Sequence, residues 1–260
     1  MMNVQLSFFP EEQVTSNSPN QNSKNTSKSP KALLPKTTKL KVAPTERQKL
    51  YAWVTRIAKL MAGDSQCQYA AWFPTRYQYD KLASGFDSEK WQTQHEEFLI
   101  KRAAQLQAEG FTVYVEDANS FKVNGKISNI CISGKPDILA IKHGQVIVED
   151  CKTGQRKAAH RMQVLIYMLL LSVAPDSRCK GLIPEGRLVY PDGVVDLPSS
   201  DVDSQFKELF RKTVAVISNS QPARMAPSFC ECRFCDIPAK YCPARIDSEP
   251  PSGSVEHDLF

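Results

Sequence analysis

Apolar residues recur at intervals of three or four positions in four segments of the chain, which predicts four amphipathic or buried helices. The first helix is expected to begin at Thr45, which forms a capping box with Gln48, and to end at Gly63. The other three are predicted over about residues 88–109, 157–173 and 201–218. Gly110 ends the second of them, and Pro175 follows the third.

Apolar and polar residues alternate mainly between the second and third helices, and this pattern predicts strands. The predicted strand segments are 111–115, a hairpin over 120–132 around Asn124-Gly125, 137–141, 146–151, and a further hairpin over 187–197. His143-Gly144 is expected to form a tight turn between two of them. The pattern indicates helices flanking a mostly antiparallel or mixed sheet, in the α/β or α+β class.

Composition divides the chain into a tail, a folded domain and a second tail. Residues 16–44 are dense in Ser, Thr, Asn, Lys and Pro, so they cannot bury enough apolar area to become ordered. We therefore expect residues 1–44 to be a disordered tail, 45–245 to be one domain, and 246–260 to be a flexible tail.

The overall composition is that of a globular protein, with 42% hydrophobic and 23% charged residues among 260. No run of about 18 apolar residues predicts a membrane span, and the N-terminus does not resemble a secretory signal, so a cytoplasmic location is expected. The net charge of +5 arises within residues 1–50, and the remaining residues are balanced. Overall charge therefore does not by itself indicate binding to nucleic acid.

Two acidic residues stand at the ends of neighbouring strand segments. Asp137 opens one segment, and Asp150 closes an otherwise apolar run two positions before Lys152. Side chains alternate along a strand, so Asp150 and Lys152 share a face while Cys151 points into the opposite, buried layer. Two carboxylates that meet across strands repel each other and, as hard oxygen ligands, suit Mg²⁺ or Mn²⁺. A lysine beside such a cation can orient water and stabilise charge that develops on a phosphodiester.

The alternative for these residues is a surface hairpin with solvated charges and an ion pair between Asp150 and Lys152. Charged residues are common on exposed strands, so an Asp-x-Lys triplet alone is weak evidence. The apolar character of the strand and the second acid, Asp137, favour a site.

These residues resemble the PD-(D/E)XK motif, and Gln163 with Tyr167 resembles the QxxxY motif, of RecB-like nucleases. The resemblance implies a restriction-endonuclease-like core with a central mixed sheet flanked by helices. It also implies that the metal is held by Asp137, Asp150, the Cys151 carbonyl and a histidine on an upstream helix. His95 fits that histidine, although it shares a helix face with apolar residues, where a core histidine would also lie.

The resemblance implies a divalent-metal-dependent DNA nuclease in which Lys152 positions the attacking water. An exonuclease acting on single-stranded or free-ended DNA is expected. Two alternatives remain: a catalytically idle adaptor that binds DNA on the same fold, and a zinc-stabilised protein without a role on nucleic acid.

Four of the eight cysteines fall within thirteen residues near the C-terminus. In a reducing compartment such a group more often binds metal than forms disulfides. Cys232, Cys235 and Cys242-Pro243 resemble the C-terminal triplet of the iron–sulfur branch of RecB-like nucleases, which includes CRISPR-associated exonucleases and the AddB nuclease domain. The resemblance implies that a fourth, distant ligand, Cys67, completes an iron–sulfur cluster, with 4Fe–4S expected over 2Fe–2S.

The alternative is a local zinc site that uses Cys230 with Cys232, Cys235 and Cys242. The spacing of Cys230-Glu-Cys232 is tighter than in an ordinary zinc knuckle, which favours the cluster.

The first residues contain a short apolar peptide, Gln5-Leu6-Ser7-Phe8-Phe9, within a polar tail. It resembles the pentapeptide that docks on the bacterial sliding clamp, and chance is the alternative. The chain lacks a phosphate-binding Gly-Lys-Thr loop, so any unwinding is expected to come from a separate helicase or other repair or CRISPR protein.

Overall fold

A five-stranded mixed sheet forms the centre of the computed structural model, which describes residues 43–83, 88–126 and 128–249. The Gln5–Phe9 peptide, nearly all of the N-terminal tail and residues 250–260 lie outside the described residues, which all belong to the compact unit Val42–Phe260. The strand order is β10-β9-β8-β7-β4. The strands are β4 (Thr112–Val115), β7 (Ile138–Lys142), β8 (Gln145–Cys151), β9 (Glu185–Tyr190) and β10 (Gly193–Leu197).

Strands β8 and β9 are parallel, and the other neighbours in this sheet are antiparallel. The expected turn joins β7 to β8, with φ angles of 49° at His143 and 84° at Gly144. Glycine tolerates this left-handed backbone, which closes the hairpin and aligns Ile138 with Glu149 at its open end. The predicted mixed sheet is therefore confirmed.

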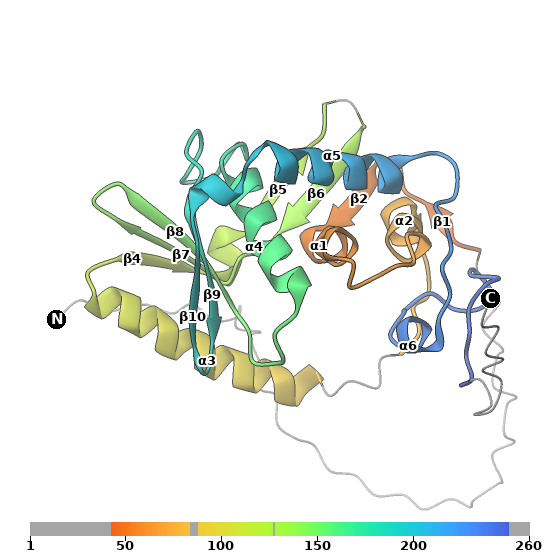
Figure 1. Cartoon of the computed structure of the whole chain (residues 1–260), viewed down its shortest axis with the longest axis horizontal. Helices are drawn as coiled ribbons and strands as arrows, with labels where there is room; N and C mark the ends of the chain where they lie inside the picture. Colours follow the sequence, from red (N-terminus) through yellow and green to blue (C-terminus); the bar gives the residue numbers. More distant parts are fainter. Residues whose placement is uncertain (1–42, 84–87, 127, 250–260) are drawn as a thin grey trace, which may run out of the picture. The chain divides into compact units, whose positions relative to one another are not determined.

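Helices cover both faces of this sheet (Figure 1). Helix α3 (Ser88–Ala108) packs through Leu99 and Leu106 on one face, in the cluster that contains Ile147 and Cys151. Helix α4 (Ala158–Leu171) covers the opposite face, with α1 (Val54–Ala62) and α5 (Ser204–Ser218) packed around it in the larger core. The predicted flanking helices are thereby confirmed.

The first helix is shorter than predicted, and the capping box at Thr45 is wrong. Residues Thr45–Glu46 form β1, which pairs with β3 (Tyr77–Gln78), and Leu50–Trp53 form β2. β2 pairs in parallel with β6 (Ile130–Gly134), which also pairs with β5 (Phe121–Asn124) in a separate three-stranded sheet. β6 is buried along its whole length, so its backbone groups require partners on both sides, and β2 supplies one side.

The hairpin between β5 and β6 has a longer loop than the predicted two-residue turn. Asn124 pairs with Cys131, and the Gly125 amide donates to the carbonyl of Ile130. The two strands still lie antiparallel, so the hairpin is confirmed and its turn type is corrected.

The cysteine-rich C-terminal segment contains the short helix α6 (Phe229–Cys232) and packs against α2 (Tyr69–Arg76). An aromatic cluster joins the two segments: Phe73 stacks on Tyr69 with ring centroids 5.4 Å apart and on Tyr241 at 5.7 Å. No helix among the described residues is long and apolar enough to span a membrane.

Candidate active site

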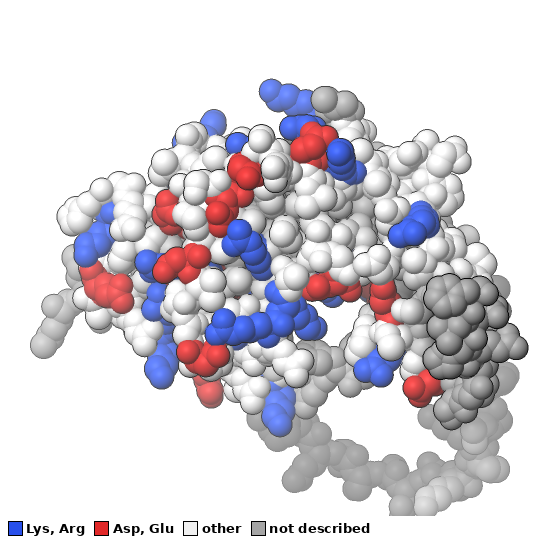
Figure 2. Space-filling view, viewed as in Figure 1, with Lys and Arg blue, Asp and Glu red and all other residues white. Residues whose placement is uncertain are grey.

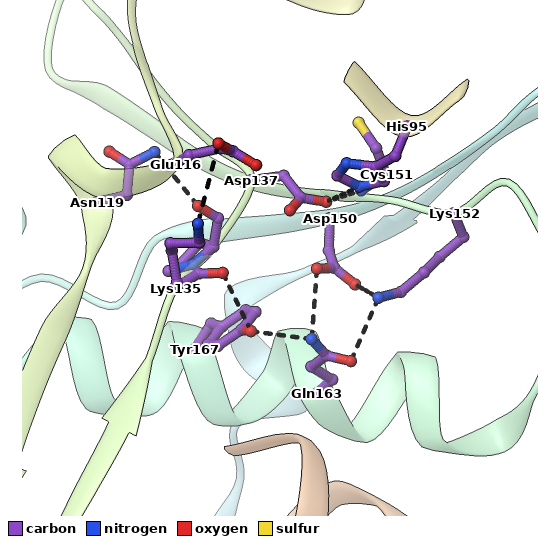
Figure 3. A network of polar contacts seen from close by, with 11 residues as sticks. His95, Glu116, Asn119, Lys135, Asp137, Asp150, Cys151, Lys152, Gln163 and Tyr167 are labelled. Carbon is purple, nitrogen blue, oxygen red and sulfur yellow. Dashed lines mark hydrogen bonds and ion pairs between the residues drawn. The ribbon is translucent and has the colours of Figure 1, made fainter. Parts of the chain in front are cut away.

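The two predicted acids meet where β7 begins and β8 ends (Figure 3). Asp137 directly precedes β7, and its Oδ2 atom accepts a hydrogen bond of 2.7 Å from the backbone amide of Cys151. Asp150 lies beside it in β8, fully buried, on the face covered by α4. The Cys151 side chain packs on the opposite face, under α3. The alternation of β8 therefore separates the two side chains as predicted.

Lys152 and Gln163 surround the Asp150 carboxylate. Lys152 Nζ lies 2.5 Å from Asp150 Oδ2 and 3.3 Å from Gln163 Oε1. Gln163 Nε2 lies 3.5 Å from Asp150 Oδ1. The amide of Gln163 thus bridges the carboxylate and the ammonium group, and it restricts where Lys152 can point.

Tyr167 extends this network one turn further along α4. Its hydroxyl accepts a hydrogen bond of 2.9 Å from Gln163 Nε2 and donates one of 3.3 Å to the carbonyl of Lys135. A Cβ atom at Gly134 would lie 2.8 Å from the Tyr167 ring, so glycine is needed for this close approach. The QxxxY pair therefore connects α4 to the loop that carries Asp137.

His95 reaches the site from α3. It is buried, its ring stacks on Trp91 with centroids 4.9 Å apart, and its Nε2 atom lies 3.3 Å from Asp137 Oδ2. The hydrogen bond to Asp137 raises the pKa of His95 despite the opposing effect of burial. The upstream histidine predicted from sequence thus lies against one of the two acids.

The charges of the site depend strongly on one another. Burial raises the pKa of Asp150 to about 6, the charge of Lys152 opposes that rise, and the charge of Asp137 adds to it. Burial lowers the pKa of Lys152, but the negative charge of Asp150 outweighs burial and holds that pKa above its ordinary value. Lys152 is therefore a cation at neutral pH rather than a base.

Two observations bear on a metal ion at this site. Asp150 Oδ2 is buried and accepts no well-oriented hydrogen bond from any described residue, so this oxygen has spare acceptor capacity beside the Lys152 charge. Asp137 and Asp150 are hard oxygen ligands, which fit Mg²⁺ or Mn²⁺. Within the described ranges, no three His, Cys, Asp or Glu side chains are already arranged to hold a metal ion.

Comparison with known proteins agrees with this geometry. The model of the PD-(D/E)XK nuclease superfamily matches residues 42–243, which include every element described above. The chain belongs to the PD-(D/E)XK nuclease superfamily. This superfamily generally comprises metal-dependent nucleases that use Mg²⁺ or Mn²⁺ and act on DNA.

Other comparisons add less. No curated protein matches the chain. A solved structure titled "Crystal structure of SSO0001" aligns with 77% of this chain and 89% of its own, with 17% identity and a TM-score of 0.36.

Glu116 is a third acid near this superfamily site, and sequence reasoning did not identify it. It lies just after β4 with φ 40°, a left-handed backbone that is uncommon outside glycine, and its amide donates to the carbonyl of Asp137. Its carboxylate lies 3.9 Å from Lys135 Nζ, and its charge contributes to the raised pKa of His95. Neither the left-handed backbone of Glu116 nor its contact with Lys135 can be recognised from the local sequence.

Three of the four predicted cluster cysteines pack in one group of apolar residues. Cys67, Cys235 and Cys242 belong to one cluster with the aromatic residues of α2. Burial, then the charges of Cys67 and Cys232, raise the pKa of Cys242, and Cys67 also contributes to the raised pKa of Cys235. Within the described ranges these cysteines are not already arranged as a metal-binding group.

Glu231 joins the distant Cys67 to the C-terminal segment. Its carboxylate accepts hydrogen bonds from the amide of Gln66 at 3.0 Å, from Ser65 Oγ at 3.0 Å and from the amide of Cys67 at 3.4 Å. Cys230, in contrast, is exposed. The arrangement therefore brings Cys67 to the triplet and leaves Cys230 at the surface.

Proposed function

We propose that this chain is a divalent-metal-dependent exonuclease that acts on single-stranded or free-ended DNA. One observation carries the proposal: Asp137, Asp150 and Lys152 share one buried polar network with Gln163 and Tyr167 of α4. If Asp150 and Lys152 formed only a structural ion pair, a second acid such as Asp137 would not be needed beside them. Burial of like charges is costly, and a catalytic site gives such a pair a role.

Asp137 and Asp150, with His95 and the Cys151 carbonyl, are the groups proposed to hold Mg²⁺ or Mn²⁺. When bound, the ion would polarise the phosphodiester and lower the pKa of a coordinated water. Lys152 stays charged because Asp150 raises its pKa, so its ammonium group would stabilise negative charge that develops on the phosphate. Gln163 holds Lys152 and Asp150 in fixed relation, and Tyr167 holds Gln163.

The test is digestion of labelled single-stranded DNA by the anaerobically purified protein with Mn²⁺ or Mg²⁺. Lys152→Ala should be folded and inactive, and Lys101→Ala, which removes an exposed lysine from α3, should retain activity. Linear and circular single-stranded substrates distinguish the mode of attack, because an exonuclease degrades only the linear one. Binding of DNA without cleavage under any divalent ion would instead support the idle adaptor.

We further propose that Cys67, Cys232, Cys235 and Cys242 hold an iron–sulfur cluster, with 4Fe–4S preferred. Support comes from the packing of Cys67, Cys235 and Cys242 in one group of apolar residues and from the Glu231 contacts that hold the Cys67 backbone. A zinc site built from Cys230 with the triplet has less support, because Cys230 is exposed while Cys67 is beside the triplet. Such a cluster would bind the segment before α2 to the C-terminal segment.

Matched cysteine variants separate the cluster from zinc. Anaerobically purified protein should be brown and contain iron and acid-labile sulfide, and Cys67→Ser should lose both. Cys230→Ser should keep them. A colourless protein with one zinc ion, lost in Cys230→Ser and kept in Cys67→Ser, would show that the local zinc site is correct.

A further inference from the structure

Two lysines lie where the end of α1 meets the start of α4, near the proposed active site. Lys59 is in the last turn of α1, and Lys157 is the N-cap residue of α4. Asp64, just beyond α1, joins these two ends, since its Oδ2 atom accepts a hydrogen bond of 3.0 Å from the amide of Ala159. Both lysines are exposed.

The arginines near the two lysines are paired with carboxylates. Arg56 pairs with Asp236 at 2.9 Å, and Arg161 pairs with Asp201 at 3.0 Å. Lys59 and Lys157 form no ion pair with any residue that the structure describes. Figure 2 shows Lys and Arg side chains gathered in the part of this face where Figure 1 places the start of α4.

The electrostatics agree with this geometry. Partial desolvation by the surrounding protein atoms, then the charges of Arg56 and Lys157, lower the pKa of Lys59 although its side chain is exposed, while Asp64 and Asp236 act in the opposite direction. Asp64 and Asp236 oppose the repulsion between the two lysines without forming an ion pair with either, and a bound anion would relieve that repulsion further.

This pair of lysines continues from the catalytic lysine. Lys157 follows Lys152 by five positions. Burial and then the charges of Lys152 and Lys157 lower the pKa of His160 to about 4, so this histidine experiences the charge of both lysines. On the other side, Arg56 is one turn before Lys59 on α1 and pairs with Asp236, the residue after Cys235. The lysines without an ion pair, Lys157 and Lys59, thus lie along the way from the paired cation Lys152 to Arg56, whose partner Asp236 belongs to the cysteine segment.

We propose that Lys59 and Lys157 bind successive backbone phosphates of a single DNA strand on its course between the Asp137–Asp150–Lys152 site and the cysteine segment. This inference rests on the proposed nuclease function and names the surface that holds its substrate. A lysine ammonium is a compact point charge on a flexible stem, which suits sequence-independent contact with phosphate. The two lysines act as positioning residues, since they contact the strand away from the scissile bond.

The experiment measures binding of a fluorescein-labelled single-stranded oligonucleotide by anisotropy, in EDTA, at a series of KCl concentrations. The test variant is Lys59→Ala/Lys157→Ala. The matched control, Lys101→Ala/Lys180→Ala, removes two exposed lysines from α3 and from beyond the other end of α4. A third variant, Lys59→Arg/Lys157→Arg, keeps both charges, and thermal melting verifies that every variant folds.

Loss of two phosphate contacts on a single strand should lower the slope of log affinity against log salt by about 1.4. If the electrostatic contribution vanishes near 1 M salt, this slope corresponds to binding about 25-fold weaker at 0.1 M KCl. The control and the arginine variant should keep the wild-type slope. Absence of wild-type binding, an unchanged slope in the test variant, or an equal change in the control overturns the inference.

Cleavage by the wild type against Lys152→Ala is scored separately on the same oligonucleotide. If the wild type cleaves and the slope is unchanged in the test variant, the nuclease function is supported and the phosphate contacts of Lys59 and Lys157 are contradicted. If the wild type never cleaves and the slope is lowered as expected, the nuclease function is contradicted, and Lys59 and Lys157 are supported as part of a DNA-binding surface.

Discussion

His95 Nε2 lies 3.3 Å from Asp137 Oδ2, although one residue is on α3 and the other precedes β7. The contact forms at the end of the sheet where β7 begins. Helix α3 therefore contributes to a site whose Asp150, Lys152 and Gln163 side chains lie on the face covered by α4. In the metal-free protein it is an ion pair when His95 is protonated. In the proposed metal complex, the imidazole must lose that proton to become a ligand.

Replacement of His95 tests whether this residue serves the metal. His95→Gln should weaken Mn²⁺ binding by about tenfold or more, because a ligand or a residue that orients a ligand is lost. Calorimetric titration of Mn²⁺ into the variant measures the change. His143→Asn, at the exposed β7–β8 turn, is the control, and equal affinities for all three proteins would contradict the assignment.

Metal affinity should depend on pH near 6. Asp150 has a pKa raised to about 6 by burial, and the pKa of His95 is raised by Asp137, so both sites carry protons at acid pH. The proton on each must leave before Mn²⁺ binds, and affinity should therefore rise with pH and level off once both are deprotonated. Titrations between pH 5 and 8 measure this, and an affinity independent of pH would show that neither group binds the ion.

The stability of the metal-free protein should fall as pH rises, whereas metal affinity should rise. The raised pKa of Asp150 means that its ionisation opposes folding, so stability is lost as pH rises from the ordinary carboxyl range through about 6. The His95 contribution is also present at low pH and is lost as pH rises through its raised pKa. The melting temperature in EDTA should fall by several degrees between pH 5 and 8, and less in Asp150→Asn. A melting temperature that rises over this range would be the contrary result.

The Tyr167 hydroxyl should affect turnover more than binding. Tyr167→Phe removes the acceptor for Gln163 Nε2 and the donor to the Lys135 carbonyl, while the ring still packs against Phe121 and Gly134. One hydrogen bond contributes about 1 kcal/mol, so kcat should fall about fivefold with KM nearly unchanged. Steady-state kinetics on linear single-stranded DNA separate the two parameters. Tyr51→Phe, in β2, is the control, and a change confined to KM would refute a positioning role.

Glu149 should support the fold rather than the chemistry. It is fully buried on the face opposite Asp150, where Arg102 donates two hydrogen bonds of 2.7 Å and Arg187 lies 3.4 Å away. Glu149→Ala leaves the Arg102 guanidinium without its carboxylate partner and removes one of the two carboxylates beside Arg187, so it should lower the free energy of unfolding by about 3–5 kcal/mol. Urea unfolding measures the loss. Asp196→Ala, which removes the exposed partner of Arg187, should cost less than about 1 kcal/mol. Comparable losses for the two variants would contradict this reading of Glu149.

Part of the fold follows directly from local pattern. The ranges of α3, α4 and α5 and the β7–β8 hairpin were predicted within a few residues, because each is long or has a clear turn signal. The segment at residues 50–53 was assigned wrongly to a helix. Its apolar residues fit helical spacing, but the buried β6 strand pairs with them and makes them a strand. Such pairing between distant segments cannot be read from local periodicity.

The sequence by itself determined which residues of the candidate site share a face, because strand alternation places Asp150 and Lys152 on one face and helical spacing does the same for Gln163 and Tyr167. It also marked His95 and the four cysteines by resemblance. Tertiary structure decided which groups come together: His95 with Asp137, the Cys67 backbone with Glu231, Glu116 with Lys135, and the end of α1 with the start of α4. These contacts depend on how the helices pack across and beside the sheet. This packing brings together residues that are remote along the chain, and their spacing in the sequence does not predict the distance between them.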